Sequence, residues 1–190
     1  MYVPKYLFFT KGIGVHKEKI ASLEIALRDA GIAQLNIMEV SSIFPPNCRI
    51  IEAEEGLSML SPGEVTPCVL AKAHSNEPGR RIVASIGLAL PQEEGKYGFL
   101  SAHHAYGETE DEGGEYAEDL AATMLANTLG IDFDVDKDYD ERKEVFRMSG
   151  KIVETWHTTL GALGHDNGKW TSVIVAAVFA GSRKSRENAF

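Results

Sequence analysis

The residues best placed for unusual chemistry in this sequence are two adjacent serines, Ser41 and Ser42, which end an apolar run just before Pro45 and Pro46. Serine is a mediocre strand former. The two prolines prevent a helix and push Phe44 toward extended geometry. We therefore expect the backbone at the serines to have a defined shape at a strand end, where strain would make the bond between them reactive. A serine hydroxyl in such a position can attack the carbonyl carbon of the residue before it.

That attack would convert the Ser41–Ser42 peptide bond into an ester. β-Elimination would then break the chain and leave a dehydroalanine, which hydrolyses to a pyruvoyl group at the new N-terminus. The product is a ketone made from the protein itself, which can condense with a substrate amine and accept its electrons. The reaction needs a strained or exposed bond and hydrogen-bond donors for the oxyanion, but no catalytic triad. Spacing alone leaves open the alternative of an ordinary turn, and by itself favours it.

The elements that would position the serines follow from hydrophobic periodicity. Strands are predicted over 2–9, 35–40, 49–52, 65–74, 81–90, 97–106, 149–163 and 169–179, and long helices over 17–30 and 110–129. The glycine-bearing segment 10–14 is predicted as a loop, and Asp166-Asn-Gly168 as a tight hairpin turn. Strands and helices do not alternate regularly. This order predicts an α+β sandwich of layers, with helices covering the faces of sheets.

Each long helix has an apolar stripe that predicts its buried face. In the first helix the stripe is Ile20, Leu23 and Leu27. Glu24 falls beside it, about 40° from Ile20, where its carboxylate can reach solvent. In the second helix the stripe comprises Tyr116, Leu120 and Met124.

Composition limits the class of protein. The 190 residues fit one domain with a sizeable core. The chain has 19 basic and 28 acidic side chains, a net charge of −9, which argues against a nucleic-acid partner. No apolar run is long enough for a membrane span, and the N-terminus does not resemble a signal peptide. Cys48 and Cys68 have no metal-type spacing. We expect a cytoplasmic protein with no membrane partner and no bound metal.

Residues 30–46 resemble the self-cleavage region of the pyruvoyl-dependent arginine decarboxylases. The resemblance extends through 11–16, 84–91, 97–101 and the C-terminal hairpin, so it covers essentially the whole chain. Its most specific part is the core Asn-x4-Ser-Ser-Ile-x-Pro-Pro, which begins at Asn36. It implies a four-layer αββα sandwich. It also implies homo-trimers, or dimers of trimers, with active sites between subunits. The domain 1–190 would be divided by self-cleavage into chains 1–41 and 42–190.

The resemblance also implies roles for individual residues. Ser42 would become the pyruvoyl group, and Ser41 the carboxyl end of the short chain. Asn36 matches an asparagine that assists cleavage, although a strand asparagine can equally satisfy backbone groups. Glu24 matches an acidic position that receives the substrate's guanidinium group, a suitable role because the two oxygens of a carboxylate pair with a guanidinium fork.

The sequence departs from the family at Ala102. The family has a glutamate there, expected to protonate the substrate carbon after carbon dioxide leaves. Loss of a positioned general acid costs about 10²- to 10⁴-fold in rate. His104 would share a strand face with Ala102 and is the one neighbour that could substitute, although paired histidines are more often structural. The other interpretation is that Ala102 is an introduced change that disables the site.

The sequence therefore predicts a pyruvoyl-dependent enzyme that decarboxylates L-arginine to agmatine and carbon dioxide. Its cofactor would be a covalently bound pyruvoyl group derived from Ser42, without metal or pyridoxal phosphate. Two alternatives stay open. One is a non-catalytic or uncleaved homologue that serves as a scaffold or regulatory subunit. The other is a decarboxylase of a different amino acid.

Overall fold

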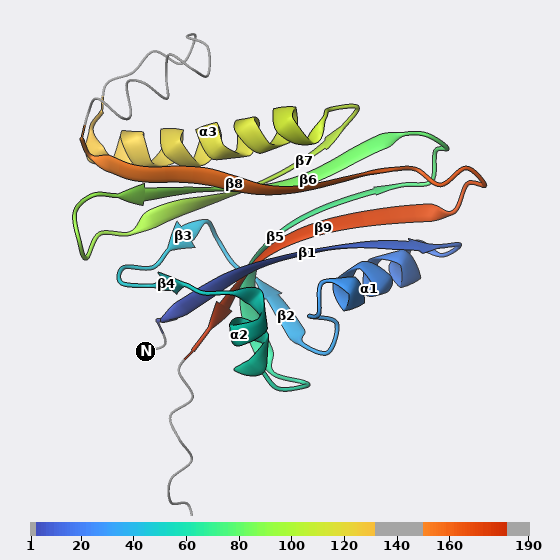
Figure 1. Cartoon of the computed structure of the whole chain (residues 1–190), viewed down its shortest axis with the longest axis horizontal. Helices are drawn as coiled ribbons and strands as arrows, with labels where there is room; N and C mark the ends of the chain where they lie inside the picture. The colour runs from blue at the N-terminus through green and yellow to red at the C-terminus, as the bar shows by residue number, and fades with distance from the viewer. Residues whose placement is uncertain (1–2, 132–149, 182–190) are drawn as a thin grey trace, which may run out of the picture.

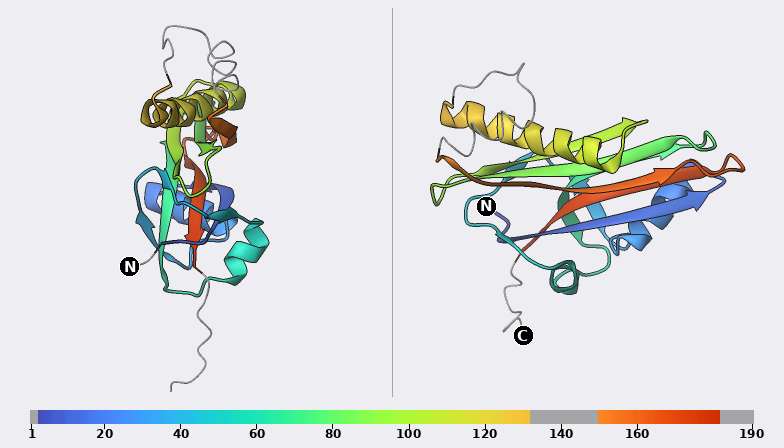
Figure 2. Two further views of the ribbon diagram at one scale, coloured as in Figure 1. Left: turned by 90° about the vertical axis from the view of Figure 1, so that its left-hand side faces the viewer. Right: turned by 45° about the horizontal axis from the view of Figure 1, so that its top comes forward.

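The computed structural model describes residues 3–131 and 150–181 and arranges them in four layers, helix–sheet–sheet–helix (Figure 1). Helices α1 (Lys19–Asp29) and α2 (Ala53–Ser58) lie against a five-stranded sheet. Helix α3 (Glu110–Leu129) covers the outer face of a four-stranded sheet. Figure 2 shows the same stacking from two further directions. The predicted α+β sandwich is confirmed.

Each sheet has a short strand at the edge nearest the serine pair. The five-stranded sheet has the order β2 (Asn36–Glu39), β5 (Val65–Ser75), β9 (Trp170–Ala180), β1 (Tyr6–His16) and β4 (Arg49–Ile50). The four-stranded sheet has the order β3 (Ile43–Phe44), β7 (Gly98–Tyr106), β6 (Arg81–Pro91) and β8 (Ile152–Leu163). The consecutive strands β2 and β3 are therefore edge strands of different sheets, and the chain must cross between the sheets to connect them.

The prediction of a loop over residues 10–14 is wrong, because β1 continues through this segment to His16. Its glycines are required by packing. A Cβ on Gly12 would lie 2.2 Å from the carbonyl oxygen of Ala26, and one on Gly14 would lie 2.0 Å from that of Ser22. Real Cβ atoms do not come that close to an oxygen, so the two glycines let the backbone of α1 rest directly on β1.

The buried face of α1 differs from the predicted stripe. Leu23 and Leu27 pack against the core, as expected, but Ile20 is 75% exposed. The fully buried residues are Ser22 and Ala26, whose small side chains suit the close approach to the glycines of β1. The periodicity thus identified the helix but not all of the face it buries.

Helix α3, like α1, packs on its sheet through small residues. Tyr116 and Leu120 are exposed, contrary to the prediction, whereas the buried face consists largely of small residues. A Cβ on Gly87 of β6 would lie 2.1 Å from the carbonyl oxygen of Ala117, so this helix also packs against a glycine. Both helices therefore contact their sheets through backbone and small side chains.

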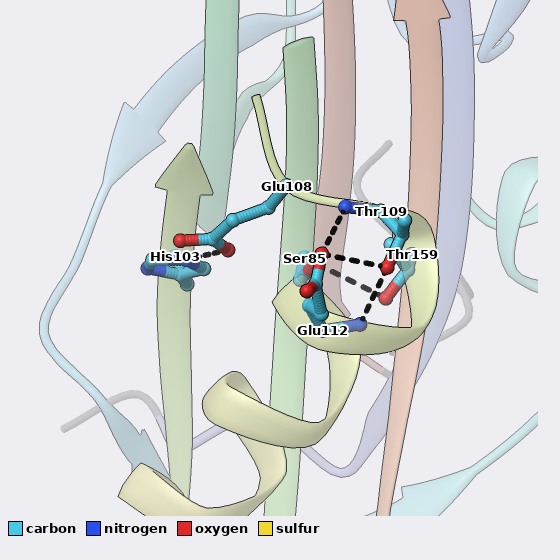
Figure 3. Close-up of polar contacts among 6 residues, drawn as sticks. All are labelled: Ser85, His103, Glu108, Thr109, Glu112 and Thr159. Atoms are coloured by element: carbon cyan, nitrogen blue, oxygen red, sulfur yellow. Dashed lines mark hydrogen bonds and ion pairs between the residues drawn. The ribbon is translucent and has the colours of Figure 1, made fainter. Parts of the chain in front are cut away.

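The ends of α3 are set by local signals. The Thr109 hydroxyl accepts a hydrogen bond from the Glu112 amide (3.2 Å), and the Glu112 carboxylate accepts one from the Thr109 amide (2.7 Å), as Figure 3 shows. The Glu112 carboxylate also accepts a hydrogen bond from the Thr109 hydroxyl (2.9 Å), and the two bonds that Thr109 donates to this carboxylate lower the pKa of Glu112. At the other end Gly130 adopts the left-handed conformation, with φ of 63°, and ends the helix as predicted.

The predicted turn before β9 forms, but it does not make a hairpin. Gly168 has φ of 71°, and its amide donates to the carbonyl of His165. However, β8 pairs with β6 in one sheet, and β9 pairs with β1 and β5 in the other. The turn therefore carries the chain from one layer to the next, as the β2–β3 connection does.

Candidate active site

The Ser41–Ser42 bond lies in the connection where the chain passes from β2 to β3 (Figure 1). The Val40 amide donates to the carbonyl of Cys68 (3.0 Å), which extends the β2–β5 ladder by one residue. Ser41 is exposed and Ser42 is half-buried. The bond between the serines is thus accessible to solvent.

Hydrogen bonds fix the shape of this crossing. The Ile43 amide donates to the carbonyl oxygen of Ser41 (3.0 Å), which closes a three-residue turn centred on Ser42. The Leu100 amide of β7 donates to the carbonyl oxygen of Ser42 (2.7 Å). Within the described ranges Asn47 is the one non-glycine residue with positive φ, so the turn at Ser42 has negative φ. The shape is therefore well defined but lacks the strain of a left-handed backbone.

The crossing brings Ser42 and position 102 to the same part of the molecule. Phe44 and Leu100 both belong to the cluster of buried side chains between the sheets. Strand alternation puts Ser42 on the face of Phe44, and Ala102 on the face of Leu100. Ala102 lies two residues beyond Leu100, or about 7 Å along β7. It is exposed at the open edge, and its methyl group offers no proton.

The two histidines after Ala102 point to opposite faces of β7. His103 turns toward α3, where its Nε2 lies 3.1 Å from the Glu108 carboxylate (Figure 3), and its ring packs on Tyr116. His104 is exposed on the face of Ala102. It is two residues farther than Ala102 from the strand position opposite Ser42.

Asn36 does not contact the serines of its own chain. It begins β2, is exposed, and donates from its side-chain amide to the carbonyl of Gly63 (2.7 Å). The ladder from Asn36 to Val40 spans about 13 Å. Within one chain, then, Asn36 satisfies a backbone carbonyl.

Glu24 lies on the outer row of α1, four residues after Ile20 and four before Arg28. Its carboxylate accepts a hydrogen bond from the Arg28 guanidinium, and both side chains are exposed. A surface hollow of about 410 Å³ is lined by Glu24, Arg28, Gly31, Ala33 and Gln34. Glu24 thus already binds a guanidinium group, and that group belongs to its own chain.

The sequence reasoning missed a buried polar network that anchors α1. His74 Nδ1 lies 2.7 Å from Ser172 Oγ, which lies 2.7 Å from Ser22 Oγ. Ser22 donates its only hydroxyl proton to the carbonyl of Lys19 (2.8 Å), so Ser172 must donate to Ser22, and His74 Nδ1–H to Ser172. Burial, followed by the charges of Lys19 and Lys72, lowers the pKa of His74. The neutral imidazole is therefore connected through Ser172 to Ser22 of α1, the helix that carries Glu24.

The two cysteines supply no reactive group. Both are buried. Burial raises the pKa of Cys48 to about 11 and, with the nearby Glu39 carboxylate, that of Cys68 to about 12. Their thiols stay protonated at neutral pH and are poor nucleophiles.

Over residues 3–131 and 150–181, no three or more His, Cys, Asp or Glu side chains are grouped so that they could hold a metal ion. Within the same residues no helix is long and apolar enough to cross a membrane.

Comparison with known proteins identifies the family. The family model described as pyruvoyl-dependent arginine decarboxylase (PvlArgDC) matches residues 6–184. The chain belongs to this family. The resemblance inferred from the serine segment is therefore confirmed.

Curated relatives of the pyruvoyl-dependent arginine decarboxylase family match nearly full length. Pyruvoyl-dependent arginine decarboxylase 2 of Methanosarcina acetivorans is 52% identical over 181 residues, which cover 95% of this chain and 99% of that protein. The pyruvoyl-dependent arginine decarboxylase of Methanococcoides burtonii is 53% identical over 177 residues, 93% of this chain and 98% of that protein. A protein of Chloroherpeton thalassium named probable pyruvoyl-dependent arginine decarboxylase is 56% identical, with coverage of 93% and 97%.

The family is named for a covalent pyruvoyl group, and the serine crossing fits the formation of such a group. The bond is exposed, its carbonyl already accepts a hydrogen bond, and the residue after it is held by the second sheet. The resemblance implies active sites between subunits, and within the single chain the side chains expected to complete the site do not all lie together. Ser42 and position 102 lie along one edge, while Asn36 and Glu24 bind other groups of their own chain.

Proposed function

We propose that this chain is the proenzyme of a pyruvoyl-dependent arginine decarboxylase. It cleaves itself between Ser41 and Ser42, converts Ser42 to a pyruvoyl group, and then decarboxylates L-arginine to agmatine and carbon dioxide. The observation that carries the proposal is the exposed, hydrogen-bonded serine crossing in a member of this family. The pyruvoyl ketone condenses with the substrate α-amine and accepts the electrons released when carbon dioxide leaves.

Each active site is completed by a second copy of the chain. The separation of Asn36 and Glu24 from the serine crossing supports this, because their own chain uses these side chains elsewhere. Exposed apolar side chains on α1 and on the β2–β5 edge, among them Ile20, Met38 and Val65, support self-association. A contact between two different surfaces of the same chain closes into a ring, here a trimer or a pair of stacked trimers.

Glu24 binds the guanidinium group of the substrate, and Asn36 assists cleavage from across the interface. The exposed carboxylate of Glu24 supports this role, because one of its oxygens already accepts a hydrogen bond from the guanidinium group of Arg28. Arginine matches this geometry better than an ammonium group would, which favours arginine over other basic amino acids.

With alanine at position 102, protonation of the substrate carbon after decarboxylation becomes the slow step of catalysis. Alanine cannot act as a general acid, and loss of a positioned general acid lowers the rate by about 10²- to 10⁴-fold. His104 shares the strand face but lies farther along β7 than position 102. Ala102 also favours the second candidate function, a non-catalytic homologue that retains the scaffold without turnover.

Intact-mass spectrometry of the purified chain tests the proposal. We expect two masses, for residues 1–41 and 42–190, and a hydrazine adduct on the second that reports the ketone. The Ser42→Ala variant is the matched control and should give one uncleaved mass without an adduct. A single mass and no adduct in the unaltered chain would contradict the enzyme assignment. Cleaved protein that decarboxylates another amino acid in preference to arginine would contradict the substrate assignment.

A further inference from the structure

The backbone amide of Ile43 points back at the carbonyl group that self-cleavage must attack. Its nitrogen lies 3.0 Å from the carbonyl oxygen of Ser41. The two residues are separated by Ser42 alone, so the donor, the attacked carbonyl and the attacking hydroxyl belong to one three-residue turn. This proximity needs no side chain and no second subunit.

We propose that the Ile43 backbone N–H is the oxyanion donor for cleavage of the Ser41–Ser42 bond. The inference rests on the proposed self-processing of this chain. When Ser42 Oγ attacks the carbonyl carbon of Ser41, the hydroxyl proton leaves and negative charge develops on the carbonyl oxygen. The Ile43 N–H is already aimed at that oxygen, and its hydrogen bond strengthens as the charge grows.

The remaining steps balance without an oxidant or reductant. The tetrahedral centre expels the Ser42 nitrogen, which takes up a proton, and an ester joins Ser41 to Ser42 Oγ. Loss of the Ser42 α-proton then breaks the Cβ–O bond, releases the Ser41 carboxylate and leaves dehydroalanine. Water enters, ammonia leaves, and the residue becomes a ketone. The Ile43 N–H acts in the first of these steps and afterwards forms the amide of the pyruvoyl group.

The surrounding contacts hold this donor in place. The Leu100 amide fixes the carbonyl of Ser42 (2.7 Å), and Phe44 is buried between the sheets. The turn is thus clamped at its centre and on its C-terminal side, so Ile43 cannot rotate away without breaking the contact with β7. Because the hydrogen bond is already formed, no reorganisation is needed when charge develops.

Replacing one amide by an ester tests the donor directly. Cell-free translation with a suppressor tRNA that carries the α-hydroxy analogue of isoleucine replaces the N–H of residue 43 by oxygen and keeps the side chain. We expect cleavage to slow by about 10²- to 10³-fold, the effect of losing one oxyanion donor. A time course by intact mass measures the rate. It also separates self-cleavage from hydrolysis of the new ester, because hydrolysis gives a fragment that ends at Ser42 instead of Ser41.

The chain offers a matched control at Ile51. Its amide donates to the carbonyl of Leu7 (2.9 Å), a backbone bond that does not involve the serine turn, and the same analogue removes it. We expect the chain with an ester at residue 51 to cleave itself between Ser41 and Ser42 at the rate of the unaltered chain. Normal cleavage with the ester at 43, or equal slowing with esters at 43 and 51, would overturn the donor role and leave the proposed function standing. No cleavage of the unaltered chain in this assay would overturn both.

Discussion

The serine crossing and the Glu24 hollow are built in opposite ways. The crossing is fixed by backbone hydrogen bonds, from Ile43 to Ser41 and from Leu100 to Ser42. The hollow is lined mainly by exposed side chains on one helix and the loop after it. The Glu24 carboxylate in this hollow forms an ion pair with Arg28 of the same chain. The first region is shaped by backbone bonds within one chain, whereas the second presents exposed side chains, with Glu24 paired to Arg28 at the surface. Forming the proposed cofactor therefore depends on backbone geometry, whereas binding the proposed substrate depends on an exposed charged side chain.

Restoring an acid beside the serine crossing should give the largest effect. We expect Ala102→Glu to raise kcat for arginine by about 10²- to 10⁴-fold, because the carboxyl group can return the proton that alanine cannot supply. Agmatine formation at saturating arginine measures it. Ala102→Gln is the control of equal size, and an equal gain with both variants would show that shape, not acidity, matters at this position.

Removing the charge of the Glu24 hollow should have the next largest effect. We expect Glu24→Gln to raise the KM for arginine by about tenfold to a hundredfold, the value of a charge-assisted pair, while the cleaved fraction stays unchanged. Steady-state kinetics and intact mass together separate the two effects. An unchanged KM would refute guanidinium binding by Glu24.

Mixed assemblies extend this test to the separation between the two regions. If each site takes its pyruvoyl group from one copy and Glu24 from another, co-expressed Ser42→Ala and Glu24→Gln chains, assayed at arginine well below the KM of Glu24→Gln, should regain full activity at about a quarter of the sites. Activity no greater than that of the separate variants would mean that both groups come from one chain.

Freeing Glu24 from its own arginine should produce the smallest effect, in the opposite direction. We expect Arg28→Ala to lower the KM for arginine by about two- to sixfold, because an exposed ion pair of this kind contributes only up to about 1 kcal/mol. The factor should be the same for every ligand of Glu24, since Arg28 competes with all of them equally. Arg28→Lys keeps the charge as a control, and a raised KM in Arg28→Ala would mean that Arg28 assists binding.

The extent of the prediction from sequence can be judged from particular elements. Helix α3 runs over the predicted residues 110–129 because its capping box and terminal glycine are local signals. The prediction of a loop over residues 10–14 is wrong because glycine usually marks a loop, whereas here the segment is part of β1. At Gly12 and Gly14 it instead makes room for the backbone of α1, a tertiary requirement that has no local signature.

At the candidate site, too, contacts between residues distant in the sequence could not be predicted. Ser41 and Ser42 could be proposed as a cleavage site because that chemistry depends on adjacent residues. The separation of Asn36 from Ser42 depends on how far β2 runs before the crossing, and the Ser22–Ser172 contact joins residues 150 positions apart. No periodicity encodes such contacts, so the sequence can propose candidate residues but not which of them lie together.

The position of the crossing also determines how the two fragments of a cleaved chain would be held together. A break between Ser41 and Ser42 leaves β1 and α1 on the short piece, and β1 pairs with β9 along its whole length in the interior of a sheet. The two pieces would form a strand-complemented complex held by the ladder and the core, without a covalent link between them. Unfolding it would then separate two molecules, and refolding would become a bimolecular reunion that depends on concentration. The chain would fold once as a single molecule and persist afterwards as a pair.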